Sequence, residues 1–594
     1  MTKPTLRASQ VITTFGPGAM VDLPDASVLI AGLDHWQYDP SQLAVIDEPR
    51  LLTKLADQLG RSGLTLRAPP PASDRPQGFR PDIVAWRFPE WFIVQDAELT
   101  AAGHRRRRLV HANALDGGRF RGDDRKNKSV VPIRFVHACI MGHIGDIDWP
   151  AFVHGTAGCH RELWIEERGT SGDLDAVFII CACGESRSVS QAARRDLKAL
   201  GHCNGDRPWL GAGNREPCGE LNRLLTRTAS HAYFAQLMSV ISIPDTRSPV
   251  DEVARSLWDD FLSDVETLAE LQKVRMRPTP AARLAGIDDA AVMASIDRIR
   301  NGASGSPRSV KEVEFEALTE AKDELGSDKP GGHFYARTLP AAHWQGPATQ
   351  SIERVVLVHR LREVVAQVGF TRFEAAGPDI DGELDLGVKS AALAADASWL
   401  PAVENHGEGI FLQFKAELID TWLKRQAVID RGTVLQAGFA LWKRDHEQSN
   451  REFPGLPYIL LHSLSHLLLT AVSLECGYPA SSLRERVYAR PGRYGILIYT
   501  GSPDAEGILG GLVQAGRDTP RHLRRAIELA ALCSNDPVCA YHHPALHDHQ
   551  PLNGAACHGC LLIAETSCEQ RNEFLDRALV TATVGALGAE FFGS

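Results

Sequence analysis

The sequence predicts an α+β, multidomain protein with mixed helices, short sheets and two cysteine-rich modules. Its 594 residues are enough for about four domains at roughly 150 residues each. Short apolar runs bounded by turn residues alternate with segments in which apolar residues recur every three or four positions, which indicates both strands and helices. Eleven of the 12 cysteines fall into two groups, between 139 and 218 and between 533 and 568.

The composition is that of a folded globular chain. It is 44% hydrophobic and 23% charged, which excludes global disorder and fibrous architectures. The net charge is −10, from 64 Lys and Arg against 74 Asp and Glu. An acidic chain does not coat nucleic acid by net charge, so any contact with DNA requires a local basic patch.

The sequence predicts no membrane contact. Its most apolar run, residues 458–469, is interrupted by four polar side chains, His462, Ser463, Ser465 and His466. The first 20 residues lack the apolar core of a signal peptide. We therefore expect a cytoplasmic protein, in which clustered cysteines indicate metal rather than disulfides.

Four segments are expected along the chain. Residues 1–128 form an N-terminal α+β module with strand-like runs at 83–86 and 91–94, and residues 129–244 form a first cysteine-rich, zinc-ribbon-like module. Residues 245–398 are expected to be mainly helical, because apolar residues from Val253 to Leu268 follow helical spacing. Residues 399–594 contain a long apolar helix through His466, a buried strand at 495–499 and the second cysteine group.

The most basic stretch lies in the first segment. It begins with four consecutive arginines, Arg105, Arg106, Arg107 and Arg108. Four further basic residues follow: Arg119, Arg121, Arg125 and Lys126. One interpretation is a solvated loop, and the other is a contact with the phosphate backbone of DNA.

The C-terminal cysteines predict a structural zinc site. Cys557 and Cys560, two residues apart on a tight turn, can point into one tetrahedron, which a distant pair then closes. Five cysteines compete for four places. We favour Cys539, Cys557, Cys560 and Cys568, with Cys533 as the substitute; the alternative is a set of buried free thiols.

The N-terminal group is more loosely spaced. It contains Cys139, Cys159, Cys181, Cys183, Cys203 and Cys218, with His143 among the nearby histidines. Here we place Cys159, Cys183, Cys203 and Cys218 ahead of Cys139 and Cys181 as zinc ligands. A closed site of four cysteines has no position for substrate, so both groups favour scaffolding over catalysis.

No sequence motif supports catalysis. His462 and His466 have the spacing of a zinc protease, but Ser463 occupies the place of the general base, and we expect the pair to form hydrogen bonds inside a packed interface. The chain has no glycine loop closing on Gly-Lys-Ser/Thr and no Gly-x-Ser-x-Gly elbow. We therefore predict a non-enzymatic protein whose partner supplies any ATPase.

Several ordered motifs resemble a known family. At the C-terminal end they are residues 461–488, 495–513, 533–539 and 552–577, which resemble a zinc-binding domain appended to certain DNA-repair helicases. The upstream motifs lie at residues 7–10, 15–19, 139–143, 146–149, 205–209, 362–363, 369–372 and 407–411. Together they resemble the DrmB family of the bacterial DISARM anti-phage system.

The resemblance implies a defence subunit that lacks a motor of its own. It implies a Swi/Snf-type helicase partner, DrmA, with a phospholipase-D-like protein and a DNA methyltransferase in the same system, and it gives a zinc role to Cys539, Cys557, Cys560 and Cys568. We expect a subunit that binds DNA and helps to recognise invading DNA. The alternatives are a metal-dependent nuclease that uses His547 and Asp548, and a structural assembly factor that never touches DNA.

Overall fold

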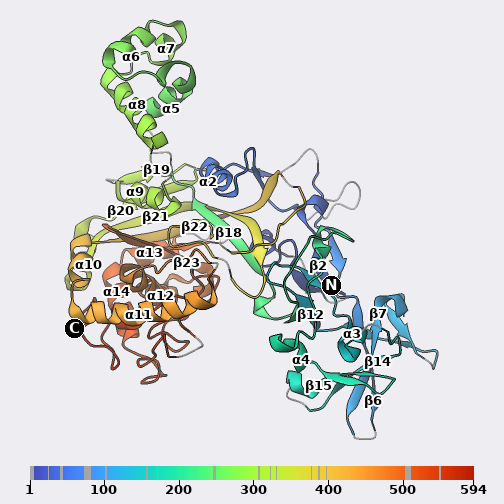
Figure 1. Cartoon of the computed structure of the whole chain (residues 1–594). Coiled ribbons are helices and arrows are strands. Elements are labelled where there is room, and N and C mark those ends of the chain that lie inside the picture. Colours follow the sequence, from blue (N-terminus) through green and yellow to red (C-terminus); the bar gives the residue numbers. More distant parts are fainter. Residues whose placement is uncertain are drawn as a thin grey trace.

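The computed structural model has a large mixed sheet at its centre (Figure 1). An N-terminal part that contains the first cysteine group lies on one side of this sheet, and a separate helical lobe lies on another. The predicted α+β, multidomain class is confirmed. The structure describes residues 6–23, 26–39, 44–71, 82–100, 103–122, 124–155, 158–169, 172–244, 249–304, 308–320, 323–329, 331–375, 377–385, 388–396, 398–447, 449–501, 510–546 and 550–593.

The central sheet has nine strands and takes them from all four predicted segments. Its main path runs β19-β20-β21-β22-β24-β23; β18 pairs with β21, and the β3–β4 pair joins β22 in parallel. The strands are β3 (Val45–Ile46), β4 (Thr65–Arg67), β18 (Phe234–Ile241), β19 (Glu324–Gly326), β20 (Phe334–Thr338), β21 (Ile352–Thr371), β22 (Trp399–Phe414), β23 (Leu483–Arg490) and β24 (Arg493–Thr500). The predicted boundaries therefore cut through one shared sheet rather than between independent units.

The prediction of a mainly helical third segment is wrong beyond helix α9 (Val310–Glu320). There the chain forms β19, β20 and the 20-residue strand β21, which pairs antiparallel with β22 from Ile352 and Phe414 to Ala366 and Ala402. Nearly every side chain of β21 from Val355 on is buried. A strand buried on both faces lacks the apolar–polar alternation that identifies a strand from its sequence.

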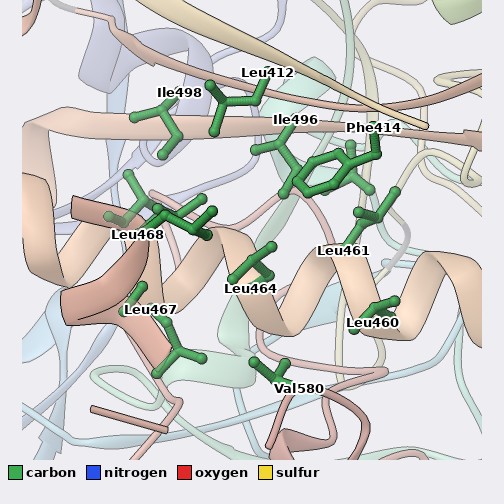
Figure 2. Close-up of a cluster of buried hydrophobic side chains, with 14 of the residues drawn as sticks. Leu412, Phe414, Leu460, Leu461, Leu464, Leu467, Leu468, Ile496, Ile498 and Val580 are labelled. Carbon is green, nitrogen blue, oxygen red and sulfur yellow. The ribbon is translucent and has the colours of Figure 1, made fainter. Parts of the chain in front are cut away.

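The predicted apolar helix forms the centre of the largest core. Helix α12 (Leu456–Cys476) packs its leucines against Phe414 and the isoleucines of β24 on one side and against Val580 on the other (Figure 2). It is the one described helix long and apolar enough to cross a membrane by length and composition, and 78% of its most apolar window is buried in protein. The neighbouring helices are α10 (Ala416–Trp422), α11 (Gln426–Asp445), α13 (Gly511–Gly516) and α14 (Thr519–Ala530).

The N-terminal part contains a six-stranded sheet of order β11-β6-β7-β14-β15-β16. Its strands are β6 (Trp91–Leu99), β7 (Arg105–His111), β11 (Val130–Pro132), β14 (Leu163–Glu167), β15 (Val177–Cys181) and β16 (Ser186–Ser188). Helices α3 (Trp149–His154) and α4 (Ser190–Ala193) pack near it. The arginine run lies in β7, so its interpretation as a loop is wrong: arginine stems pack on the sheet while their charged ends reach solvent.

Three smaller sheets and two helices, of which α2 packs against β18 of the central sheet, complete the N-terminal segments. The sheets have the orders β1-β2-β5, β10-β9-β8 and β13-β12-β17. The elements are α1 (Ala8–Thr13), β1 (Met20–Leu23), β2 (Ala26–Ile30), α2 (Pro49–Leu59), β5 (Ala85–Arg87), β8 (Leu115–Asp116), β9 (Arg119–Arg121), β10 (Asn127–Lys128), β12 (Phe135–Ala138), β13 (Ile144–Gly145) and β17 (Arg223–Thr226).

The helical lobe stands away from the sheet (Figure 1). It consists of α5 (Pro249–Ser256), α6 (Leu268–Arg275), α7 (Pro278–Arg283) and α8 (Asp289–Ser304), and α9 (Val310–Glu320) follows next to the sheet. The lobe has a core cluster of its own, which includes Leu257, Leu262, Leu271 and Ile296. The helical spacing predicted from Val253 to Leu268 corresponds to α5, a π-helical turn at Trp258–Leu262 and the start of α6.

Candidate metal centres

Metal-ligating side chains come together at four places in the described chain, each with its donor atoms within 4.8 Å of one another. Three are built mainly from cysteines: the C-terminal cysteine site (Cys533, Cys539, Cys557, Cys560), the Cys139 site (Cys139, His143, Cys203, Cys218) and the Cys183 site (His154, Cys159, Cys181, Cys183). The fourth, the buried histidine site, is His462, His466, Glu485 and Cys568.

The C-terminal cysteine site has the dimensions of a zinc tetrahedron. Bonds of about 2.3 Å from zinc to sulfur place neighbouring sulfurs about 3.8 Å apart. The Sγ atoms of Cys539 and Cys560 are 3.8 Å apart, those of Cys557 and Cys560 are 3.8 Å apart, and those of Cys533 and Cys557 are 3.5 Å apart. Four thiolates at these distances fit Zn²⁺ and leave no position for a substrate.

Backbone amides around Cys557 and Cys560 explain how the chain holds this geometry. The amides of Cys557 and Gly559 each donate to a cysteine Sγ at 3.3 Å, and Asn535 Nδ2 donates to Cys557 Sγ at the same distance. A Cβ on Gly559 would lie 2.7 Å from Ser534 Oγ, so a larger residue here would require the Ser534 side chain to move. N–H donors aimed at sulfur stabilise the thiolate form that binds metal.

The pKa values of these thiols indicate what a cation would do here. Burial raises the pKa of Cys533 to about 11, and a hydrogen bond with Cys560 together with burial raises the pKa of Cys539. For Cys557, burial acts upward, but hydrogen bonds from Asn535 and the Gly559 amide bring the net pKa below its usual value. A divalent cation would replace the protons that Cys533 and Cys539 otherwise keep at neutral pH.

The structure corrects the expected C-terminal ligand set. Cys533, the proposed substitute, lies with Cys539, Cys557 and Cys560, whereas Cys568 belongs to the buried histidine site. The reason is that Cys568 points toward α12: its Sγ is 3.1 Å from His462 Nε2. Spacing along the chain favoured Cys568 because this residue follows Cys560 closely. The spacing could not show that the backbone between them turns Cys568 toward α12.

The Cys139 site combines three cysteines with one histidine. His143 Nδ1 lies 3.4 Å from Cys139 Sγ and 3.5 Å from Cys203 Sγ, close to the roughly 3.6 Å expected between nitrogen and sulfur ligands of one tetrahedral zinc. The Sγ atoms of Cys139 and Cys218 are 4.0 Å apart. A hydrogen bond with Cys203 and another with His143 lower the pKa of Cys139 to about 4, against the effect of burial.

A carboxylate orients the histidine of this site. His143 Nε2 lies 2.8 Å from Glu216 Oε1, and Arg207 binds the other oxygen of Glu216 at 2.6 Å. A carboxylate that accepts from one ring nitrogen leaves the other nitrogen free to ligate, which is the arrangement found behind metal-bound histidines. The donor set and its surroundings therefore both fit zinc.

The Cys183 site lies at the end of β15 and is more exposed. The Sγ atoms of Cys159 and Cys181 are 3.6 Å apart, and Cys183 Sγ is 3.9 Å from Nε2 of His154, the last residue of α3. Burial raises the pKa of Cys181 to about 11. The Cys-x-Cys spacing thus supplies two ligands across the turn that follows the strand.

The predicted N-terminal ligand set is split between these two sites. Cys203 and Cys218 join Cys139, and Cys159 and Cys183 join Cys181, so a single site of Cys159, Cys183, Cys203 and Cys218 is wrong. The sequence pointed to His143 only as a neighbour, and it gave no role to His154. For His143, its position four residues after Cys139 was a signal that the sequence offered. For His154, only the fold shows that the side chain lies near the cysteines.

The arginines of β7 are largely paired with the chain's own carboxylates. Arg106 lies 3.0 Å from Glu98, Arg107 lies 3.0 Å from Glu167, and Arg108 pairs with Glu162. The exposed arginines and lysine farther along are different: no ion pair joins Arg119, Arg121, Arg125 or Lys126 to a carboxylate of the described chain. His547 and Asp548, the residues of the nuclease alternative, lie outside the described residues.

Two family models and one relative match this chain. Residues 7–234 match a family model described as a domain of unknown function (DUF8724). Residues 464–561 match the MrfA Zn-binding domain, a range that includes all four cysteines of the C-terminal cysteine site. The DISARM protein DrmB of Bacillus paralicheniformis is 31% identical over 527 residues, which cover 86% of this chain and 91% of the relative.

Proposed function

Because this chain belongs to the DrmB family of DISARM proteins, we propose that it is a non-catalytic subunit that binds DNA, partners a Swi/Snf-type helicase (DrmA) and helps to recognise invading DNA. Its membership makes it a DISARM defence subunit with a zinc-binding domain. The proposal adds the DNA contact, the helicase partner and the zinc ligands. The metal sites would then be structural, since protein ligands fill all four positions of each.

The observation that carries the DNA contact is the basic hairpin of β9 and β10. Arg119 and Arg121 alternate with the buried Phe120, so both arginine side chains lie on the exposed face, and the turn that follows exposes Arg125 and Lys126. The described carboxylates nearest in sequence are Asp116, the register partner of Arg119 on β8, and Asp124, which is within 4.0 Å of Lys128; in the described chain neither forms an ion pair with these four side chains. Their charge is thus available to phosphate groups.

The β7 arginines contribute less to this proposal than the sequence suggested. A phosphate would have to displace Glu98, Glu162 or Glu167 from them. Exposed ion pairs of this kind are individually weak, so a phosphate can displace them. The hairpin cations can bind phosphate without first breaking an ion pair. Phosphate contacts of this kind are independent of sequence and sensitive to salt.

The test is DNA affinity of the full chain at 50 and 200 mM salt. The variant R119Q/R121Q is expected to bind about ten-fold more weakly at low salt, and its plot of log affinity against log salt is expected to be shallower by up to about 1.8, or 0.9 per lost contact. The control R521Q/R525Q removes two exposed arginines of α14 that pair with Glu475 and Glu528. Equal losses in both variants would contradict the hairpin, and no binding at 50 mM salt would favour a structural assembly factor.

The helicase partnership is tested separately. The purified chain is expected to hydrolyse no ATP, because its sequence lacks the phosphate-binding loop. Co-expression with a Swi/Snf-type helicase is expected to yield a stable complex that binds DNA more tightly than either protein. ATP turnover by this chain alone, or elution of the two proteins as separate species, would contradict the proposal.

A further inference from the structure

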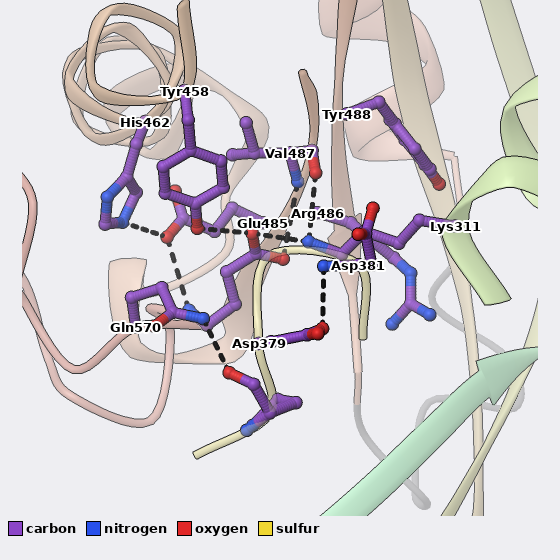
Figure 3. A network of polar contacts seen from close by, with 12 residues as sticks. Lys311, Asp379, Asp381, Tyr458, His462, Glu485, Arg486, Val487, Tyr488 and Gln570 are labelled. Atoms are coloured by element: carbon purple, nitrogen blue, oxygen red, sulfur yellow. Dashed lines mark hydrogen bonds and ion pairs between the residues drawn. The ribbon is translucent and has the colours of Figure 1, made fainter. Parts of the chain in front are cut away.

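We propose that the buried histidine site, His462, His466, Glu485 and Cys568, binds one further transition-metal ion, most suitably Zn²⁺, separately from the three cysteine-rich sites. The site joins α12, β23 and the C-terminal segment beneath the central sheet. All four residues are buried, and the side chains of both histidines and of Glu485 have no solvent exposure. Figure 3 shows His462 and Glu485 facing each other, with Tyr458 beside them.

The hydrogen bonds of the two histidines orient their remaining nitrogens toward one point. His462 Nδ1 lies 3.2 Å from the carbonyl oxygen of Phe574, and His466 Nδ1 lies 2.8 Å from that of Leu561. A ring nitrogen beside a carbonyl carries the proton, so each Nε2 is left as the free electron-pair donor. Both Nε2 atoms lie next to Glu485 Oε1, at 2.9 Å and 3.2 Å.

Protons alone explain this arrangement poorly. With neutral rings, two nitrogen lone pairs would face the lone pairs of a carboxylate oxygen, and with one ring protonated the lone pair of the other ring would still face that oxygen. With both rings protonated, two cations whose ring centroids are 4.7 Å apart would share one carboxylate in a place without solvent. A divalent cation removes the conflict, because its charge is balanced by the Glu485 carboxylate and the Cys568 thiolate.

The surroundings of Cys568 fit a thiolate ligand. Its Sγ accepts the backbone amides of Gln570 at 3.4 Å and Asn572 at 3.2 Å, and it lies 3.1 Å from His462 Nε2. Amides donate to the ligand sulfurs of the C-terminal cysteine site in the same way. The second oxygen of Glu485 accepts from Ser465, which fixes the carboxylate on the rotamer that faces the rings.

The ligand chemistry favours zinc. Two imidazole nitrogens, one thiolate and one carboxylate oxygen form a four-coordinate set of the mixed type that zinc accepts, and burial leaves no open position. The ion would clamp the C-terminal segment onto α12, because Cys568 follows the C-terminal cysteine site while His462 and His466 belong to the core helix. Its role is therefore structural.

The test is anomalous scattering at the zinc absorption edge from crystals of the full chain. A peak is expected between His462 Nε2, His466 Nε2, Glu485 and Cys568, in addition to the peak at the C-terminal cysteine site, which serves as the internal control. A peak at the cysteines with none between the histidines would overturn the proposal.

Two substitutions separate ligation from hydrogen bonding. In H466N the side-chain amide can still donate to the Leu561 carbonyl, but asparagine has no atom at the position of Nε2 to bind metal. In H466C a thiol, which is a different zinc ligand, takes the place of the imidazole. Elemental analysis is expected to show one metal equivalent fewer in H466N than in the native chain, and substantial retention in H466C. Unchanged metal content in folded H466N, or equal loss in both variants, would contradict ligation by His466.

Discussion

Residues 531–593 and residues 129–226 both contain candidate four-ligand metal sites, but only the second region has a sheet beneath the candidate ligands. In the described part of 531–593 the one regular element is the short helix η11 (Arg577–Leu579). Residues 129–226 contain strands β11 to β17 and a cluster built on Trp149 and Phe152. Where the strands of a sheet already hold the backbone around the ligands, a metal adds to stability; where regular secondary structure is almost absent, the metal itself fixes the local backbone.

The largest expected effect is loss of the C-terminal metal. C560S removes a central ligand of the C-terminal cysteine site and is expected to cost one zinc equivalent and at least about 5 kcal/mol of local folding free energy, since structural zinc supplies about 10 kcal/mol or more in small domains. Elemental analysis and limited proteolysis of residues 531–593 measure both. C476S is the control, because Cys476 belongs to none of the four sites; full zinc content in C560S would contradict the ligand assignment.

A smaller effect is expected from C183S in the N-terminal part. Cys183 is the exposed ligand of its site, and the strand that precedes it is held by β14 and β16. We expect loss of one zinc equivalent but a fall in unfolding free energy of only about 2 kcal/mol, because the cluster around Trp149 remains. Thermal unfolding with elemental analysis checks this, and a destabilisation equal to that of C560S would remove the contrast between the regions.

A third prediction concerns a titrating group in the N-terminal part. Burial raises the pKa of Asp146 from 3.8 to about 6, and its carboxylate accepts the Glu90 amide at 3.0 Å. Because the folded state holds this proton more tightly than the unfolded state, the raised pKa stabilises the fold at low pH. This stabilisation is lost as the pH rises through 6, and at pH 7.5 the buried ionised carboxylate destabilises the fold. D146N is expected to gain about 1–2 kcal/mol at pH 7.5 and progressively less as the pH falls from about 6 towards 4.

Thermal unfolding across this pH range measures the effect of D146N. D175N, which neutralises an exposed aspartate of the same part, is the control and should show no such dependence on pH. A constant gain at every pH would mean that the charge of Asp146 is not the cause.

The smallest effect is expected from removing the helical lobe. Its core cluster is its own, and both of its ends lie near the central sheet (Figure 1). Replacing residues 249–304 with a Gly-Ser linker is expected to leave zinc content unchanged and to shift the unfolding temperature of the remainder by only a few degrees, because loop length contributes weakly to stability. Loss of zinc from this variant would show that the lobe supports the metal sites.

Much of the local structure was predictable from the sequence. The strand runs at 91–94 and 495–499 correspond to β6 and β24, and the apolar helix through His466 is α12. Two features were not. The buried strand β21 has no alternating pattern, and its partner β22 begins 28 residues after β21 ends, so neither periodicity nor proximity indicates the pair.

The metal sites divide in the same way. Cys557 and Cys560 were predictable because both ligands lie on one turn. Glu485 was missed, because it is an ordinary position of a strand until β23 packs against α12 and brings it to His462 and His466. Ligands contributed by different elements become visible only when the fold brings them together, which is also why Cys568 was assigned to the wrong partners.

Hydrogen–deuterium exchange of the full chain before and after chelation of its metal tests the central contrast most directly. Residues 533–577 are expected to lose protection on chelation, whereas β6, β7, β14 and β15 are expected to keep most of theirs. Equal loss of protection in the two regions, or unchanged protection of residues 533–577 after the metal has been removed, would contradict it.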